Sequence, residues 1–233
     1  MDIDTTHLIL KTNKKIKQDS SKLRGYFGNE FKDYPILHNH YSEGKVLYSY
    51  PLIQYQIIDG QASILGIEEG ANLLRELAPK IKELKLSDSY YKVDDYTLTD
   101  KEYNVRTTNK ELHYKFVTPW LALNTKNHTK YKQIQSWKDK KLLLNNIFVG
   151  NILSMAKGLG IIVDRKLYVK SMLNPCSAPY KSVNMLGFTG EIKVKFNIPD
   201  FFGFGKGVSQ GFGSVVRIFD EENIQSEPTP KEE

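Results

Sequence analysis

The sequence is poor in cysteine and has no long apolar run, and both absences narrow the class of protein. Its single cysteine, Cys176, excludes an intramolecular disulfide and any zinc cluster built on several cysteines. No apolar stretch is long enough to span a bilayer, and residues 1–4 do not begin a signal peptide. We therefore expect a cytoplasmic protein with no membrane partner.

Several signatures of cofactor-dependent chemistry are also missing. The glycine-rich stretch near the C-terminus lacks the Lys-Ser/Thr pair of a triphosphate-binding loop and the G-x-G-x-x-G pattern of dinucleotide folds. The letters His38-Asn39-His40 are not the metal-dependent HNH nuclease motif, because that motif spreads its residues over a ββα unit with metal ligands that this sequence does not supply. Asp33 and Glu43 lie near the two histidines, but without a cysteine they make only a weak metal-ligand set. We expect no cofactor and no metal.

What the chain has instead is positive charge. The formal net charge is +6, although the last fourteen residues are acidic. A basic body favours nucleic acid or another anionic partner. Basic residues gather at two places, and for each a solvated surface is the alternative interpretation. The two groups are Lys14, Lys15, Lys17, Lys22 and Arg24, and Lys126, Lys130, Lys132, Lys138, Lys140 and Lys141.

The first half has the pattern of one compact α+β unit. Hydrophobic periodicity and turn signals predict its elements in the order β-α-β-β-α-β, which is the ferredoxin-like unit. Asp19, Ser20 and Ser21 are candidate N-caps, and Asp59-Gly60 predicts a tight hairpin. The expected elements are a strand at 7–11, a helix after 19–21, strands at 46–58 and 63–67, a helix at 69–85 kinked by Pro79, and one or two strands within 90–105.

The second half repeats this unit loosely. We expect a strand at 112–123, a long helix at 128–156, a strand at 167–172, a loop at 175–179 and strands at 190–197 and 214–219. No second helix is predicted, because a glycine-rich loop occupies its place. The predicted fold class is α+β, with two tandem ferredoxin-like (RRM-like) domains at residues 1–107 and 108–219. Residues 220–233 are expected to form an acidic disordered tail.

Three features are candidates for chemistry or binding. His38 and His40 fall in a predicted loop, where they can accept and donate protons near neutral pH, unless they are loop histidines without a role. Tyr48 and Tyr50 share a strand face with two glutamines, the wetter face, and can present phenols or stacking rings there. Ordinary strand aromatics are the alternative for both tyrosines.

The third candidate is the stretch from Asp200 to Arg217, in which two Gly-Phe-Gly triplets stand five residues apart. Consecutive free N–H groups in such a loop form a concave anion site. A flexible loop before the last strand is the alternative. The aromatic residues and Lys206 within the stretch favour a loop that faces a ligand.

These residues resemble a known family. The pattern Gly203-Phe-Gly205, five residues, Gly211-Phe-Gly213 is similar to the glycine-rich signature G-h-G-x5-G-h-G of the CRISPR repeat-processing endoribonucleases, members of the RAMP superfamily. Residues 23–28, 37–40, 48–55 and 67–70 resemble the subtype known from methanogenic archaea and some bacteria. The middle of the chain, about residues 85–185, contributes no motif to the resemblance.

The resemblance implies tandem ferredoxin-like domains and metal-independent cleavage within CRISPR repeat RNA, by attack of a 2′-hydroxyl that leaves a 2′,3′-cyclic phosphate and a 5′-hydroxyl. It implies catalytic roles for His40 first and His38 second, assisted by Tyr48, with Tyr50 as the alternative; base and acid are not assigned. It implies RNA binding by Lys14, Lys15, Lys17, Arg24, Gly203, Gly205, Lys206, Gly211 and Gly213. It also implies that Lys206 and the backbone amides of residues 203–213 face the bound RNA strand.

The implied partner is CRISPR repeat RNA, as precursor and as mature guide. Subunits of a CRISPR effector complex and a second copy of the chain are further partners that the resemblance allows. The alternative function is a non-catalytic RNA-binding RAMP subunit of such a complex.

Overall fold

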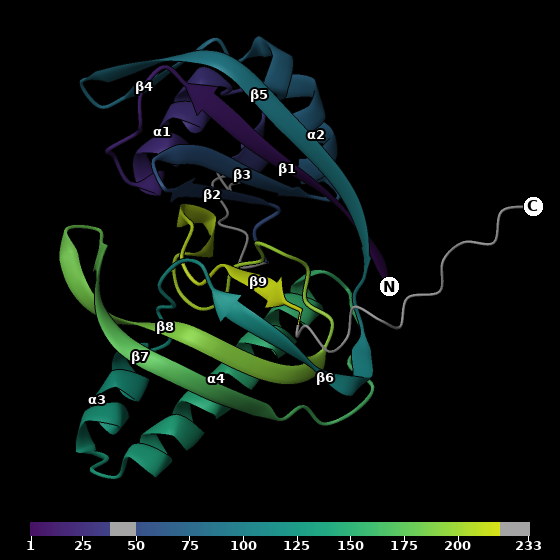
Figure 1. Ribbon diagram of the computed structural model, residues 1–233, viewed down its shortest axis with the longest axis vertical. Coiled ribbons are helices and arrows are strands. Elements are labelled where there is room, and N and C mark those ends of the chain that lie inside the picture. Colours follow the sequence, from purple (N-terminus) through teal and green to yellow (C-terminus); the bar gives the residue numbers. More distant parts are fainter. Residues whose placement is uncertain (38–49, 220–233) are drawn as a thin grey trace, which may run out of the picture.

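Two β-sheets, one in each half of the chain, organise the fold (Figure 1). The computed structural model describes residues 1–37 and 50–219. The expected tail at 220–233 lies outside these residues. In Figure 1 the first half lies above the second, and the glycine-rich segment before β9 lies between them.

The first half forms a five-stranded sheet in the order β2-β3-β1-β5-β4, in which every neighbouring pair is antiparallel. Four of these strands have the ferredoxin-like arrangement, and β4 extends the sheet beyond β5. Its elements are β1 (Asp2–Thr12), α1 (Ser20–Glu30), a 3₁₀ turn (Pro35–Leu37), β2 (Ile53–Ile58), β3 (Gln61–Ile67), α2 (Glu69–Leu77), a 3₁₀ turn (Ala78–Lys80), β4 (Glu83–Leu86) and β5 (Ser89–Asn104).

The sequence correctly predicts a helix cap and a hairpin turn in the first half. The carboxylate of Asp19 caps α1 by accepting from the amides of Ser21 and Lys22. Asp59 and Gly60 both have positive φ, 52° and 82°, as the hairpin between β2 and β3 requires. These two predictions are confirmed.

Three element boundaries were predicted wrongly. The helix expected at 69–85 is not kinked at Pro79 but ends at Leu77, because proline has no amide hydrogen to continue it. The chain then forms β4, in which Leu84 is buried against the core. Strand β1 is longer than expected, and β2 begins at Ile53, so residues 50–52 are not strand.

The second half forms a four-stranded sheet in the order β7-β8-β6-β9, with α3 and α4 along one face (Figure 1). The expected replacement of the second helix is confirmed, since the segment between β8 and β9 contains only a short 3₁₀ turn. Its elements are β6 (Thr107–Phe116), α3 (Thr125–Gln133), α4 (Trp137–Gly158), β7 (Val169–Tyr180), β8 (Val183–Phe196), η3 (Val208–Gln210) and β9 (Val215–Ile218).

Several predictions for this half were wrong in detail. The expected long helix is two helices, because Ser136 begins a new one by accepting from the amide of Asp139. The expected strand at 112–123 ends at Phe116. The expected loop at 175–179 is part of β7, which is an edge strand and so tolerates Pro175 and Pro179.

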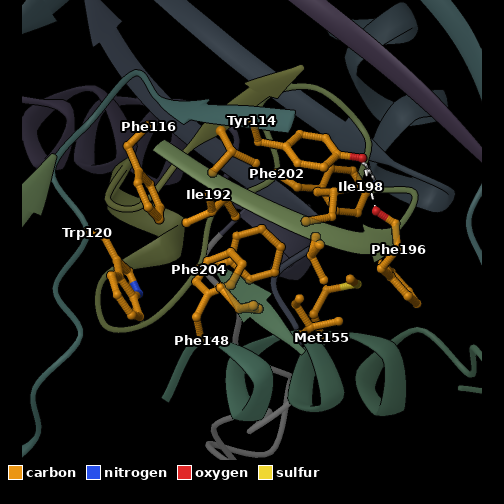
Figure 2. Packing of buried hydrophobic residues seen from close by; sticks show 14 of the residues in the cluster. Tyr114, Phe116, Trp120, Phe148, Met155, Ile192, Phe196, Ile198, Phe202 and Phe204 are labelled. Atoms are coloured by element: carbon orange, nitrogen blue, oxygen red, sulfur yellow. Dashed lines mark hydrogen bonds between the residues drawn. The ribbon is translucent and has the colours of Figure 1, made fainter. Parts of the chain in front are cut away.

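The core of the second half draws on the glycine-rich segment. Phe202 and Phe204 are 0% and 1% exposed, and the rings of Phe204 and Phe148 lie 4.9 Å apart between their centroids (Figure 2). The Tyr114 hydroxyl donates to the carbonyl of Phe196 and accepts from the amide of Ile198. Phe202 and Phe204 are therefore core residues, which anchors Gly203 between them.

The two halves meet where β2 contacts this loop. The Gln54 Oε1 atom accepts from the Gly203 amide at 2.9 Å, and Gln56 Nε2 donates to the Phe201 carbonyl at 3.2 Å and to Ser214 Oγ at 3.0 Å. Both glutamines are at most 1% exposed. The face of β2 that we expected to be wet is therefore buried between the halves.

A partly buried histidine also lies between the halves. His7 on β1 stacks on Phe201 with ring centroids 4.1 Å apart, and its Nε2 atom lies 2.6 Å from Ser63 Oγ. Burial lowers the pKa of His7 to about 4, although the charge of Asp200 acts in the opposite direction. The folded protein therefore holds this imidazole neutral down to mildly acidic pH.

No helix within residues 1–37 and 50–219 combines the length and apolar character needed to cross a bilayer.

Replacement of Gln54 by Leu should lower the free energy of unfolding by about 1–3 kcal/mol, because the buried Gly203 amide loses its acceptor. Denaturant titration measures the change. The matched control is Gln61→Leu at an exposed position of β3, expected within about 0.5 kcal/mol of wild type. Equal effects of the two variants would contradict the assigned contact.

The His7 environment predicts acid sensitivity. The folded pKa lies below the ordinary value of 6.5, so protonation favours the unfolded state and stability falls as pH drops below 6.5. Between pH 7 and pH 5 this group should contribute a loss of about 2 kcal/mol. In His7→Gln the difference in unfolding free energy between these pH values should shrink by about that amount; an unchanged difference would show that His7 is not the responsible group.

Candidate functional site

The glycine-rich loop has a left-handed backbone, which glycine adopts without steric cost, at several positions. Gly205, Gly211 and Gly213 have φ of +81°, +80° and +70°. A Cβ atom at Gly213 would lie 2.1 Å from the Phe204 carbonyl oxygen, and one at Gly211 would lie 2.4 Å from the Tyr55 carbonyl oxygen. The second glycine triplet is thus required for close packing, within the loop and against β2.

Most of the expected free amides are used inside the protein. The Gly203 amide donates to Gln54, the Gly211 amide to the Val208 carbonyl at 3.0 Å, and the Gly213 amide to the Pro119 carbonyl at 2.9 Å. The Lys206 amide donates to the Leu121 carbonyl. The expectation that the amides of this stretch face a bound strand is therefore wrong for these four groups.

An open groove of about 590 Å³ lies beside the loop, at the junction of the two halves. The loop forms one wall, the C-terminal half of α4 another, and α1 and the turn between β7 and β8 contribute the rest. The lining residues are Arg24, Tyr50, Pro51, Asn151, Ser154, Met155, Tyr180, Lys181 and residues 203–210. We refer to this feature as the groove.

Positive charge enters the groove from three separate elements. Arg24 comes from α1, Lys181 from the turn after β7, and Lys206 from the glycine-rich loop. The Nζ atoms of Lys206 and Lys181 lie 4.9 Å and 5.7 Å from the centre of the Tyr180 ring. An aromatic ring flanked by ammonium groups can stack on a base while the lysines contact phosphates.

The helix α1 is held against the loop, which places Arg24. The Ser20 hydroxyl at the start of α1 donates to the Gln210 carbonyl of η3. Arg24 follows one helical turn later and lines the groove. The contact between α1 and the loop therefore brings a cation of the first half to the second half.

The proposed catalytic residues His38, His40 and Tyr48 lie outside the described residues. The described residues that flank them are Leu37, whose carbonyl accepts from the Tyr55 hydroxyl, and Tyr50, which lines the groove. In sequence, His38 follows Leu37 directly and Tyr48 precedes Tyr50 by two positions.

Tyr50, the alternative to Tyr48, has a structural contact. Its hydroxyl donates to the Gly203 carbonyl at 2.9 Å, and its ring lies 5.6 Å from that of Phe202. Burial raises the pKa of Tyr50 well above its ordinary value. The phenol therefore stays protonated and holds the loop, and it is not on a strand as we expected.

The predicted RNA-binding residues are not all brought together. Arg24, Gly203, Gly205 and Lys206 line the groove, whereas Gly211 and Gly213 are buried behind it. Lys14, Lys15 and Lys17 lie in the connection before α1 and are not among the lining residues. Lys14 instead places its Nζ atom 5.2 Å from the Tyr91 ring centre.

Sequence reasoning missed Tyr180 and Lys181. The available signal was a tight turn between two strands, which places exposed side chains at a hairpin tip. The loop expected at residues 175–179 conceals this turn, because the two strands on either side of it are expected to be shorter than they are. Within residues 1–37 and 50–219, no three His, Cys, Asp or Glu side chains are grouped so that they could hold a metal ion.

Comparison with known proteins identifies the fold family. Family models for the Cas6b N-terminal domain and the Cas6b C-terminal domain match residues 1–104 and 106–218. An uncharacterised protein of Methanocaldococcus jannaschii is 40% identical over 144 residues, which cover 61% of this chain and 97% of that protein.

Solved structures agree with the family models. A crystal structure of Cas6b is 39% identical with a TM-score of 0.87, and one of the CRISPR RNA processing endoribonuclease Cas6b is 36% identical with a TM-score of 0.75. Each similarity covers 94% of this chain and 100% of the other.

A more distant neighbour has the same fold. Csf5, a CRISPR-Cas type IV Cas6 crRNA endonuclease, is 9% identical with a TM-score of 0.56, over 94% of this chain and all of its own. This likeness supports the tandem ferredoxin-like fold alone. Because consecutive family models match both halves and two Cas6b structures align over nearly the whole chain, the protein belongs to the Cas6b family.

Proposed function

We propose that the protein is an endoribonuclease that cleaves the repeats of CRISPR precursor transcripts to give mature guide RNAs. Membership of the Cas6b family supports CRISPR RNA as the substrate, and the groove is the structural observation that carries the proposal. Three cations from three elements surround a solvent-open channel, beside the tyrosine that flanks the segment containing both candidate histidines. Such a surface fits the phosphate backbone of an RNA strand.

The proposed reaction needs no metal. The ribose 2′-oxygen attacks the adjacent phosphorus as its proton passes to a base, and the bond from phosphorus to the 5′-oxygen breaks as an acid protonates that oxygen. The products are a 2′,3′-cyclic phosphate and a 5′-hydroxyl. His40 and His38 supply the proton transfers, since an imidazole with an ordinary pKa near ~6.5 serves as base or acid at neutral pH.

Supporting roles follow from the described contacts. Lys206, Lys181 and Arg24 are positioned to offset charge on the phosphates bound in the groove. Because the Tyr50 phenol is occupied by Gly203, the assisting phenol in the proposal is that of Tyr48. A Cβ atom at Gly203 would meet Gln54 and Phe212, and one at Gly205 would meet Leu121 and Trp120, so these two glycines act by close packing, as Gly211 and Gly213 do. Of the four, Gly205 is exposed and is the one proposed to lie against the RNA. Lys14, Lys15 and Lys17 would contact RNA outside the groove.

A non-catalytic RNA-binding subunit is the second candidate, because the groove and its cations do not depend on the histidines. Effector-complex subunits or a second copy of the chain are further proposed partners. Cleavage assays separate the two candidates.

His40→Ala should reduce the rate of repeat cleavage by about 10²–10⁴-fold, and His38→Ala should also reduce it, because each removes a proton-transfer group. Single-turnover cleavage of the repeat RNA from the same genome, in EDTA, measures the rates. Analysis of the termini should show a 2′,3′-cyclic phosphate and a 5′-hydroxyl.

The matched control is His128→Ala on α3, which should cleave at the wild-type rate. Tight binding without cleavage by wild type would favour the non-catalytic subunit. Cleavage only with added divalent metal would contradict the proposed mechanism.

Lys206→Ala should weaken repeat binding and reduce the salt dependence of affinity, with the slope of log K against log salt falling by about one unit, since one phosphate contact is lost. Binding titrations over a range of salt measure this slope. Lys166→Ala, at an exposed position before β7, is the control and should leave the slope unchanged. An unchanged slope for Lys206→Ala would show that Lys206 makes no phosphate contact with the bound RNA.

A further inference from the structure

A second hollow lies at the start of α4, away from the groove. It has a volume of about 360 Å³, within the ~300–1,000 Å³ typical of ligand sites. Two large apolar side chains at this hollow are strongly exposed, Trp137 at 52% and Met172 at 72%. The hollow is lined by Trp137, Lys141, Leu144, Met172, Asn174 and Glu191, among others, and we refer to it as the Trp137 pocket.

The lining of the Trp137 pocket combines a flat ring with hydrogen-bonding groups. The indole of Trp137 offers a stacking surface, the Asn174 amide can donate and accept, and the Glu191 carboxylate accepts. Glu191 is held in place by His113, whose Nε2 atom lies 2.8 Å from its Oε2 atom. Aromatic stacking together with hydrogen bonds to a base edge is the way proteins bind unpaired nucleotides.

Three lysines lie at or next to the Trp137 pocket. An adjoining hollow of about 200 Å³ shares Lys141 and Met172 with the Trp137 pocket and adds Lys170 and Lys193. Lys170 is also paired with Glu111, with its Nζ atom 2.8 Å from Oε1. Lysines next to an exposed indole match the alternation of phosphate and base along a single strand.

We propose that the Trp137 pocket binds a nucleotide of single-stranded RNA, with the adjacent lysines on its phosphates. This inference rests on the proposed function and extends the path of the RNA beyond the groove. A second copy of the chain is the other possible occupant of this surface, and the test below distinguishes it from RNA.

The distance between the two sites sets the length of RNA required. The groove contacts α4 at Ser154, which lies 13 positions after Lys141 of the Trp137 pocket. At 1.5 Å per residue the helix separates them by about 20 Å. A stacked strand advances about 3.4 Å per nucleotide, so roughly six nucleotides connect the sites.

The test uses the chain's own fluorescence. Of the two tryptophans, Trp120 is 0% exposed but donates to Asn151, which lines the groove, so only the quenching that is lost in Trp137→Phe is assigned to Trp137. The RNAs are the repeat with a 2′-deoxyribose at the mapped cleavage position, versions shortened from either end, and a short oligouridylate. RNA should quench wild-type emission, and Trp137→Phe should lose this signal while retaining the affinity.

Trp137→Ala should bind the full-length RNA about five- to a hundredfold more weakly and should bind RNAs too short to reach the pocket as wild type does. Ile162→Ala, at an 85% exposed apolar position, is the matched control and should bind all RNAs normally. Wild-type affinity in Trp137→Ala overturns the proposal. A change in its oligomeric mass without a change in RNA affinity also overturns it and assigns the surface to a second copy.

The two proposals fail in different ways. If wild type cleaves no repeat RNA, the endoribonuclease proposal fails, and the oligouridylate titration still tests the Trp137 pocket. If wild type cleaves but Trp137→Ala binds every RNA normally, only the pocket proposal fails.

Discussion

The structure depends on the hydrogen-bonded contact between β2 and the glycine-rich loop. Gln54 and Gln56, both buried, bond to Gly203, Phe201 and Ser214, and the Tyr50 hydroxyl bonds to the Gly203 carbonyl. Because these polar groups are removed from water, loss of any one of these hydrogen bonds would leave a buried donor or acceptor without a partner and destabilise the fold. This contact fixes the loop against the first half, and with it the wall of the groove that the loop forms.

The loop therefore acts as a structural element whose surface is functional. Its Phe202 and Phe204 fill the core of the second half, its second glycine triplet allows close packing against β2, and Lys206 reaches the groove. The charge of the site comes from side chains on α1, on the loop and on the turn after β7. In the proposed function this surface binds the RNA, while proton transfer belongs to the histidines between α1 and β2.

Much of the fold was predictable from the sequence because local signals are strong there: the Asp19 cap, the Asp59-Gly60 turn, and the alternation in β8 each act within a few residues. Predictions failed where tertiary context decides. The alternation in β2 predicts that Gln54 and Gln56 face water, but both are buried by the glycine-rich loop about 150 positions away. Pro175 and Pro179 predict a loop, but they lie on an edge strand, where proline is tolerated. Arg24 and Lys206 were predicted for the site, whereas Tyr180 and Lys181 depend on a hairpin whose strands were predicted too short.

Hydrogen exchange at the Gly203 and Gly213 amides tests most directly the claim that the loop is a structural contact and not a cradle of free amides. If the account is right, both amides exchange slowly in the free protein and binding of repeat RNA changes them little, because their acceptors are Gln54 and Pro119. Fast exchange in the free protein, with protection only when RNA is bound, would contradict it.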